Sequence, residues 1–331
     1  MEAFEARYWE PEGEAGAVRC GLCPHRCFIV DGARGRCRVR ENRGGRLFSL
    51  IYGHVVSAHV DPLEKKPLYH FHPGSSVLSI GTNGCNLSCP FCQNYEISQG
   101  LTDGAQLPPE EIVRLGGAGG SIGVAYTYNE PFIWFEYVLD CARSAKEKGL
   151  VNVLVTNGYV SPEPLEELLP YVDALNIDLK ALDDGFYKRL CGGRLEPVLE
   201  TIRRSARRAH VELTNLLVTD ENDSPEQVAA LADWVASEVG RQTPLHLSRY
   251  FPAYRFKAPR TPQERMLAAW EAARERLDFV YMGNVVTEIG GDTVCPACGA
   301  VVIERQGYSI RVVGLADGSC SYCGRKLPIV V

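Results

Sequence analysis

Eleven of the thirteen cysteines of this 331-residue chain fall in three short clusters, which divide the chain into three parts. Only Cys141 and Cys191 stand alone. An odd number of thiols in tight groups is more typical of metal binding in a reducing compartment than of a disulfide framework. We therefore expect a cytoplasmic protein whose clustered cysteines hold soft metal ions or iron–sulfur clusters.

The overall charge and hydropathy exclude several classes of protein. Acidic side chains outnumber basic ones by 41 to 35, which disfavours a general nucleic-acid binder. No apolar run approaches the ~18 residues of a membrane-spanning helix. Residues 1–5 are acidic and lack the apolar core of a secretory signal. We expect no membrane segment and no export signal.

Short β-rich runs alternate with helical patterns between the second and third cysteine clusters. The expected strands are 77–81, 122–126, 151–156, 174–179, 211–218, 245–250 and 279–285. The clearest helical patterns are 131–148, 195–209, 224–239 and 262–277. This alternation predicts βαβ units and a parallel sheet. Because 77–287 is shorter than the ~250 residues of a complete eight-unit barrel, we predict an α/β fold with a partial (βα)6 TIM-like barrel. A doubly wound sheet is the alternative.

The cysteine clusters suggest the domain boundaries. We expect a Cys-rich N-terminal module with a β-like lead-in over 1–76, the partial barrel over 77–287 and a zinc-ribbon-like module over 288–331. Residues 19–46 contain eight arginines and two acids. We interpret this basic segment as a solvated face that balances thiolate charge, and contact with an acidic partner or ligand is the alternative.

The central cluster consists of three cysteines on the segment that follows the first expected barrel strand: Cys85, Cys89 and Cys92. Three thiolates cannot close a four-coordinate structural zinc site. They can hold three irons of a [4Fe–4S] cluster and leave the fourth iron open for a substrate or cofactor. The segment also lies where barrel enzymes carry their active sites, at the C-terminal end of a strand. The alternative is a redox or structural cluster with a fourth ligand elsewhere.

The Cys-x3-Cys-x2-Cys spacing, with Phe91 before the last cysteine, resembles the signature of radical S-adenosylmethionine (SAM) enzymes. The resemblance implies that SAM binds the open iron. It also implies that an electron from the cluster cleaves SAM to methionine and a 5′-deoxyadenosyl radical, which abstracts hydrogen from a substrate. An external electron donor such as a flavodoxin or ferredoxin is implied as well.

Glu130 and Pro131, at the end of the second expected strand, match part of the Gly-Gly-Glu-Pro segment of this family. In the family that segment lies close to the SAM amino group, so the resemblance implies cofactor contacts for Asn129 and Glu130. Tyr128 and Asn129 depart from the two glycines. A glutamate at a helix N-terminus favoured by the helix dipole is the alternative interpretation.

Two further segments resemble the glycyl-radical-enzyme activases, such as the pyruvate formate-lyase activating enzyme. They are the Thr-Asn-Gly segment beginning at Thr156 and Asn157, and the Asp-x-Lys segment of Asp178 and Lys180. In activases these residues surround SAM, a cation site and the substrate glycine. Val155 stands where activases often carry Asp, which weakens the case for the cation site.

These patterns give a set of candidate site residues. The implied cofactor-binding residues are Phe91, Asn129, Glu130, Thr156, Asn157 and Asp178. The candidate catalytic residues are Asp178, Lys180 and His246. Asp178 and Lys180 share one side of an extended strand and could instead form a structural ion pair. His246 lies on the sixth expected strand and faces either the substrate or the core.

The flanking cysteines close two four-ligand sites. Two C-x2-C-G knuckles predict tetrahedral zinc, with rubredoxin-type iron as the alternative, at Cys295, Cys298, Cys320 and Cys323. The N-terminal set, for which spacing alone does not separate zinc from a second cluster, is Cys20, Cys23, Cys27 and Cys37. We favour zinc there. Cys141 is expected in the core, and Cys191 lies either in the core or near the active site.

The chain as a whole resembles the radical SAM enzyme of the AmmeMemoRadiSam system. The segments that carry this resemblance are 23–27, 64–71, 85–94, 126–131, 176–180 and the Cys-rich C-terminus. It implies partners similar to Memo and AMME-region proteins and supplies no substrate. The expected function is a radical SAM oxidoreductase of the activase type, which forms a glycyl radical on a protein partner.

Other functions stay open at this stage. The chain could be a radical SAM enzyme that modifies RNA or a small metabolite, or a non-enzymatic iron–sulfur electron carrier. Equal numbers of acidic and basic residues in 288–331 disfavour RNA binding by that module.

Overall fold

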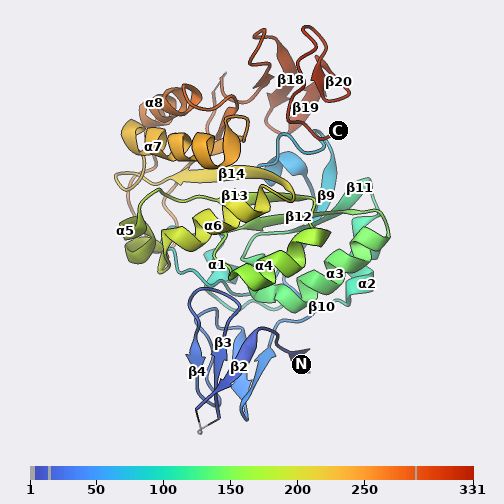
Figure 1. The fold of residues 1–331 in the computed structure, drawn as a ribbon, viewed down its shortest axis with the longest axis vertical. Coiled ribbons are helices and arrows are strands. Elements are labelled where there is room, and N and C mark those ends of the chain that lie inside the picture. Colours follow the sequence, from blue (N-terminus) through green and yellow to red (C-terminus); the bar gives the residue numbers. More distant parts are fainter. Residues whose placement is uncertain (1–3, 14–15, 288) are drawn as a thin grey trace.

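The computed structural model describes residues 4–13, 16–287 and 289–331. At its centre is one sheet with the strand order β16-β15-β14-β13-β12-β11-β9-β8 (Figure 1). The parallel strands are β9 (Ser76–Gly81), β11 (Ser121–Tyr126), β12 (Val151–Thr156), β13 (Ala174–Asp178), β14 (His210–Leu217), β15 (Leu245–Arg249) and β16 (Val280–Gly283). The antiparallel edge strand is β8 (Ser57–Pro62), which pairs with β9.

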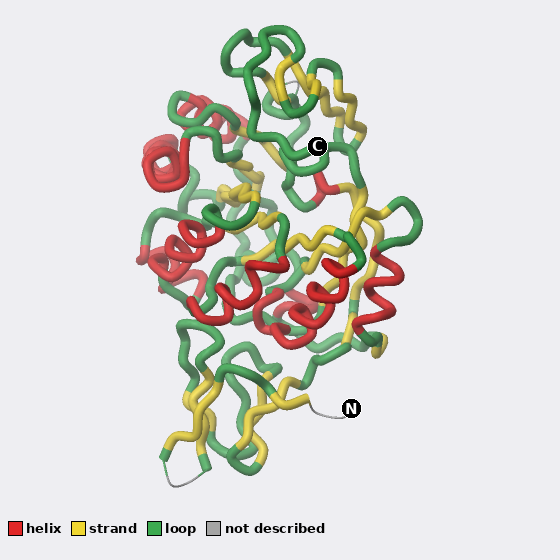
Figure 2. The backbone as a smooth tube through the Cα atoms, turned by 45° about the vertical axis from the view of Figure 1, so that its right-hand side comes forward, coloured by secondary structure: helices red, strands yellow, loops and turns green. Residues whose placement is uncertain are grey.

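A helix follows each parallel strand except β16, and these helices surround the curved sheet (Figures 1 and 2). They are α2 (Pro109–Gly116), α3 (Phe135–Glu147), α4 (Pro162–Leu168), α6 (Leu195–Ser205), α7 (Pro225–Val235) and α8 (Gln263–Arg274). The strands neighbour one another in chain order, whereas a doubly wound sheet would reverse direction at a switch point. The predicted α/β partial (βα)6 barrel is therefore confirmed.

Shorter helical segments complete the barrel region. They are η1 (Leu63–Lys65), α1 (Tyr95–Ser98), η2 (Pro131–Trp134), η3 (Leu169–Tyr171), α5 (Asp184–Phe186), η4 (Tyr187–Cys191) and η5 (Ala236–Gly240). Local sequence explains where helices begin: Ser224 and Gln227 form a capping box at the start of α7. Among the described helices, none combines the length and the apolar content needed to cross a lipid bilayer.

The N-terminal module forms two small sheets at one end of the molecule (bottom of Figure 1). Their strands are β2 (Trp9–Glu12), β3 (Ala17–Cys20) and β4 (Phe28–Ile29) in one, and β1 (Phe4–Glu5), β6 (Arg46–Ser49) and β5 (Arg40–Arg43) in the other. A third, two-stranded sheet pairs β7 (His54–Val55) with β10 (Ala105–Gln106). The acidic start of the chain is described only from Phe4, because residues 1–3 lie outside the described part. The lead-in runs on into β8, which belongs to the main sheet.

The C-terminal module lies at the opposite end (top of Figure 1). Its strands are β17 (Thr293–Val294), β18 (Val301–Gln306), β19 (Ser309–Val312), β20 (Leu315–Ala316) and β21 (Ser319–Cys320). The module packs back onto the lead-in, since Arg305 Nη2 donates to the Tyr69 carbonyl at 2.7 Å and Val330 N donates to the His70 carbonyl at 2.8 Å. Glu288, the first residue expected in this module, lies outside the described residues.

Candidate active site

The loop after β9 carries Cys85, Cys89 and Cys92. Asn129, on the connection between β11 and η2, fixes the start of this loop. Its Nδ2 donates to the Gly84 carbonyl at 3.0 Å, and its Oδ1 accepts from Thr82 N at 3.1 Å. Gly84 has a φ of +95°, and a Cβ there would come within 2.8 Å of the Cys37 carbonyl, so only glycine fits. One predicted site residue therefore positions the cysteine loop.

Hydrogen-bond donors approach two of the three thiols. Cys85 Sγ accepts from Asn157 Nδ2 at 3.5 Å and from Leu87 N at 3.4 Å, and Cys92 Sγ lies 3.1 Å from Ser98 Oγ. Burial raises the pKa of the Cys85 thiol well above its ordinary value. Because a metal ligand must be the thiolate, donors aimed at sulfur favour the metal-binding form over the buried thiol.

For Cys191 the sequence left two interpretations open, a core residue or a residue near the active site. In the structure it lies beside Cys89, at the end of η4. Its carbonyl accepts from Ser88 N at 2.9 Å. Contact with the Cys191 thiol, together with the Lys180 ammonium, lowers the pKa of Cys89. Cys191 is fully buried, so it belongs both to the core and to the surroundings of the cysteine loop. Cys141 is fully buried in α3, as predicted.

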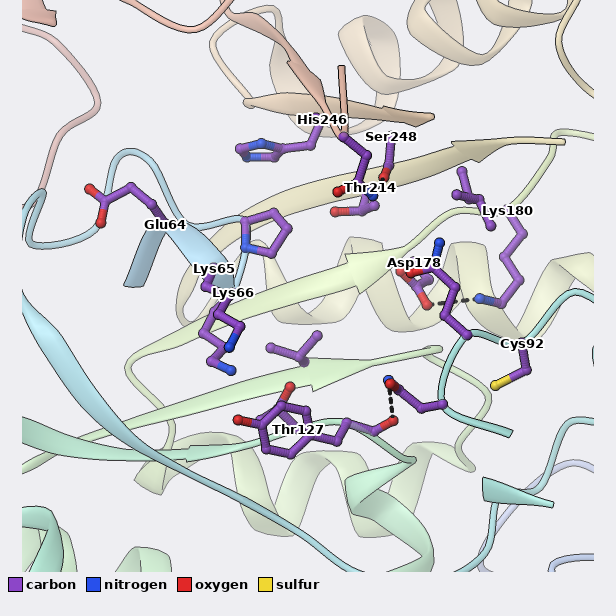
Figure 3. A pocket seen from close by; sticks show the side chains of 18 of the residues that line it. Glu64, Lys65, Lys66, Cys92, Thr127, Asp178, Lys180, Thr214, His246 and Ser248 are labelled. Atoms are coloured by element: carbon purple, nitrogen blue, oxygen red, sulfur yellow. Dashed lines mark hydrogen bonds and ion pairs between the residues drawn. The ribbon is translucent and has the colours of Figure 1, made fainter. Parts of the chain in front are cut away.

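One cavity of about 850 Å³ gathers the predicted site residues at the C-terminal ends of the strands (Figure 3). This volume lies within the ~300–1,000 Å³ of small-molecule and cofactor sites. The predicted residues that line it are Cys85, Cys89, Phe91, Cys92, Asn129, Glu130, Thr156, Asn157, Asp178, Lys180 and His246. Residues that are more than 150 positions apart in the sequence therefore share one space with the three thiols.

Glu130 is buried between the ends of β11 and β12. Its Oε1 accepts from Phe132 N at 3.0 Å and from Thr156 Oγ1 at 2.8 Å, and its Oε2 accepts from Asn157 N at 2.8 Å. A carboxylate offers about four acceptor positions, so one position on Oε2 has no partner among the described residues. Burial raises the pKa of Glu130 to about 7, although these three donors oppose that rise.

Asp178 and Lys180 form an ion pair of 2.7 Å at the end of β13. In Figure 3 the pair lies on the same side of the cavity as Cys92. Burial alone would lower the pKa of Lys180, but the Asp178 carboxylate and the nearby thiols raise it well above its ordinary value. The ammonium is therefore fixed in its charged form next to the cysteine loop. The predicted pairing of these two side chains is present, and they also line the cavity.

His246 lies farther from the cysteine loop. Its Nε2 is 2.7 Å from Oε2 of Glu212, and in Figure 3 its ring is on the other side of the cavity from Cys92. Glu212 is fully buried and also contacts His210 and accepts from Tyr69 N and His70 N. These partners hold the pKa of Glu212 well below its usual range, against the effect of burial. His246 thus has a satisfied nitrogen and also faces the cavity, which combines the two expected roles.

Sequence reasoning missed the cavity residues that come from outside the barrel. Lys66, in the lead-in, is buried against Asp61 at 2.8 Å and places its ammonium 4.4 Å from the Tyr128 ring centroid. Arg305, in β18, stacks 4.3 Å from the Tyr69 ring centroid. The segment 64–71 stood out in the sequence because it resembles the same segment of a known subfamily, but that resemblance assigned no role to any of its residues. Nothing in the alternating pattern of β18 distinguished Arg305.

The four C-terminal cysteines lie in the geometry of one tetrahedral ion. The Cys295–Cys323 and Cys298–Cys320 Sγ–Sγ distances are both 3.7 Å. All four sulfurs lie within 4.8 Å of one another. Zinc–sulfur bonds of ~2.3 Å set tetrahedral sulfurs about 3.8 Å apart. The predicted four-cysteine group is therefore assembled, and its spacing fits zinc.

Comparison with known proteins places these features in a family. The model of the radical SAM superfamily matches residues 79–235. An uncharacterized protein of Methanocaldococcus jannaschii is 42% identical over 335 residues, which cover 99% of both chains. The pyruvate formate-lyase-activating enzyme of Clostridium pasteurianum is 27% identical over 161 residues, which cover 45% of this chain and 65% of that enzyme. The chain thus matches somewhat less than two thirds of the length of that activating enzyme.

Solved structures show the same fold. A radical SAM methyltransferase from Sphaerobacter thermophilus aligns with a TM-score of 0.53 at 15% identity and covers 90% of this chain and 81% of that one. Streptococcus suis SuiB bound to S-adenosylmethionine aligns with a TM-score of 0.51 at 16% identity and covers 67% of this chain and 53% of that one. At these identities the likeness concerns the fold alone.

Proposed function

Because this chain belongs to the radical SAM superfamily and is homologous to glycyl-radical-enzyme activases, we propose that it cleaves SAM reductively and abstracts hydrogen from a substrate. A [4Fe–4S] cluster with SAM supplies, when bound, a one-electron cleavage to methionine and a 5′-deoxyadenosyl radical. The observation that carries the proposal is the shared cavity, in which three thiols, a buried glutamate and a lysine–aspartate pair converge.

The residues present fit such a cluster. Cys85, Cys89 and Cys92 offer three thiolate ligands, and donors from Asn157 and Ser98 reach two of the sulfurs. Among the described residues, the four C-terminal cysteines form a group tight enough for one zinc ion, whereas these three thiols do not. A cubane cluster suits such spacing, since iron and sulfide ions lie between its ligands.

The cofactor contacts follow from the free hydrogen-bonding positions. The remaining acceptor position of Glu130 Oε2 suits the SAM amino group, because a buried carboxylate binds a donor from a charged or polar amine strongly. Lys180 Nζ has three donors and uses one on Asp178, so two remain for the SAM carboxylate or for substrate. Phe91, Asn129, Thr156 and Asn157 complete this end of the cavity. We assign His246 to the substrate end.

A protein is the substrate class that the cavity mouth supports best. Three lining residues expose large apolar surface there: Val286 (96%), Tyr308 (60%) and Ile289 (44%). Exposed apolar groups around a cavity suit a polypeptide better than a small polar metabolite. The homologous activating enzymes act on proteins, as their names state. We therefore propose that a glycine of a protein partner donates the hydrogen.

The subfamily, the partners, the electron donor and the compartment are part of the same proposal. We place the chain in the AmmeMemoRadiSam subfamily, with partners similar to Memo and AMME-region proteins, with a flavodoxin or ferredoxin as electron donor, and with the cytoplasm as its compartment. The C-terminal four-cysteine group would hold structural zinc.

Deuterium transfer tests the substrate class. Candidate partner proteins are produced with dideuterated glycine and incubated anaerobically with the reconstituted enzyme, SAM and titanium(III) citrate. We expect deuterium in 5′-deoxyadenosine and a glycyl doublet in the electron paramagnetic resonance (EPR) spectrum of the partner. If deuterium is transferred only from a small metabolite or from RNA, the protein-substrate proposal is wrong, although SAM cleavage itself stands.

A further inference from the structure

The four N-terminal cysteines surround a second, separate cavity. Cys20 ends β3, Cys23 and Cys27 lie on the connection to β4, and Cys37 precedes β5. All four line one cavity, and its other walls come from Leu22, His25, Gly35, Arg36, Arg40 and Ile133. Cys20 and Cys37 are buried, while Cys23 and Cys27 are half-buried. The spacing in the sequence did not separate zinc from an iron–sulfur cluster for this set, and zinc was the favoured interpretation.

The spacing of the thiols differs between the two four-cysteine sets. The C-terminal sulfurs lie 3.7 Å apart in two pairs and form one group within 4.8 Å. In the described part of the chain, no three of the N-terminal thiols come together in this way. One zinc ion draws its sulfurs to about 3.8 Å from one another. A [4Fe–4S] cluster keeps its thiolates farther apart, because its irons and sulfides lie between them.

Arg40 gives a second, independent indication of a ligand. It lines the cavity and is only 1% exposed. Its Nη1 donates to the Arg7 carbonyl at 2.8 Å, and its Nη2 pairs with Glu136. Its Nε is buried and has no hydrogen-bond partner among the described residues. An anionic cluster with four thiolates would supply the missing acceptor, and Arg36 N already donates to Cys27 Sγ at 3.5 Å.

Two close contacts connect the residues around this cavity to the cysteine loop of the candidate active site. His25, two residues after Cys23, places its Nε2 2.8 Å from the carbonyl of Asn86, which directly follows Cys85. On a second path, the Cys37 carbonyl packs so closely against Gly84 that a Cβ there would lie 2.8 Å from it. Each path joins a cysteine of one set to a residue next to Cys85 through covalent bonds and one close contact.

We propose that the N-terminal cysteines hold a second [4Fe–4S] cluster that relays electrons to the cluster at Cys85, Cys89 and Cys92. A reduced flavodoxin-type donor loses one electron, and the second cluster passes from the 2+ to the 1+ state. It returns to 2+ when it reduces the active-site cluster by one electron. Zinc has no redox chemistry and cannot take this role. The metal assignment stands alone, whereas the relay rests on the proposed function.

Metal content tests the assignment. A triple variant, Cys85→Ala, Cys89→Ala and Cys92→Ala, leaves the N-terminal set intact. After anaerobic purification and reconstitution we expect it to keep about four irons and four sulfides per chain. After reduction its [4Fe–4S]⁺ EPR signal should not respond to SAM. If the purified triple variant contains no iron and two zinc ions per chain, the proposal is wrong.

Two further variants separate the sites. Cys23→Ala with Cys37→Ala should lose about half of the iron of the wild-type protein, because one of two clusters is lost. Cys298→Ser is the matched control, which should lose zinc and keep all the iron. If the N-terminal variant keeps the full iron content, the ligand assignment is wrong. If that variant does not fold, the triple variant still decides the metal.

Two reductants test the relay. Titanium(III) citrate reaches an active-site cluster directly, whereas reduced flavodoxin requires a route through the protein. In the Cys23→Ala, Cys37→Ala variant, we expect flavodoxin-driven SAM cleavage to be lost and titanium-driven cleavage to be retained. Equal loss with both reductants, or no loss with either, would overturn the relay. If the wild-type protein cleaves no SAM with titanium(III), the proposed function fails, while the metal-content result stays valid.

Discussion

Replacing Glu130 by glutamine should weaken SAM binding more than it weakens the fold. Three of the four acceptor positions of the Glu130 carboxylate are filled by Phe132 N, Thr156 Oγ1 and Asn157 N, so only one is left for the cofactor. A hydrogen bond to a charged group contributes ~1.5–3 kcal/mol. Since 1.4 kcal/mol is tenfold in affinity, Glu130→Gln should raise the Kd for SAM roughly 10- to 100-fold.

The pH dependence makes this prediction specific to Glu130. Burial raises the pKa of its carboxyl to about 7. In the proposed complex, only the ionised carboxylate can accept from the SAM amino group at this position. Below pH 7 the carboxyl must release a proton before it can accept, so the Kd should rise up to about tenfold for each unit by which the pH falls. Above pH 7 this contribution levels off. The Glu130→Gln variant should lose this pH dependence of the Kd and keep only the dependence that comes from the titration of SAM itself.

Calorimetric titration of SAM at pH 6, 7 and 8 measures both effects on anaerobic protein with equal iron content. Asp223→Asn is the matched control, because Asp223 is 1% exposed, accepts from Asp220 N and Arg265 Nη1, and does not line the cavity. It should bind SAM as the wild type does. Wild-type affinity and an unchanged pH profile in Glu130→Gln would show that Glu130 only braces the strand ends.

The remaining predictions concern the metal sites and the ion pair. Replacing any one of the three loop cysteines by alanine should abolish SAM cleavage: Cys85, Cys89 or Cys92. Near wild-type turnover in any of these variants would show that the ligand set is wrong. Cys298→Ser should lose close to one zinc per chain by mass spectrometry and lower the melting temperature, because structural zinc supplies folding free energy; retained zinc would contradict the four-thiolate site. Asp178→Asn and Lys180→Met should keep the cluster spectrum and weaken SAM binding by ~1–3 kcal/mol, whereas a purely structural pair would lower only the melting temperature. If Lys180 faces substrate instead, Lys180→Met should leave SAM cleavage intact and uncouple it from hydrogen abstraction.

The central strands could be predicted closely because one physical cause, burial on both faces of the sheet, sets their sequence pattern. Strands covered on both faces need continuous apolar runs, and β12 occupies the expected residues 151–156. The edge strand β8 could not be predicted as part of the same sheet. Its segment exposes His59 and Val60, and an antiparallel partner leaves no mark in such a pattern.

Much of the candidate site could also be predicted, because parallel strands bring their C-terminal ends to one edge of a sheet. Thr156 and Asp178 end the neighbouring strands β12 and β13, and His246 lies on β15 of the same parallel sheet, so that all three line the cavity. The contacts of Glu212 could not be predicted, since its donors Tyr69 N and His70 N lie more than 140 positions away in the sequence. The entry of Arg305 into the cavity depends likewise on how the C-terminal module packs back onto the lead-in.

SAM cleavage tests the central claim most directly. The anaerobically reconstituted protein is incubated with SAM and titanium(III) citrate, and 5′-deoxyadenosine and methionine are quantified over time. Reductive cleavage predicts that both products form in equal amounts with the wild-type protein and that neither forms with Cys89→Ala. Fully iron-loaded wild-type protein that binds SAM and yields no 5′-deoxyadenosine would contradict the account, as would equal yields from the Cys89→Ala variant.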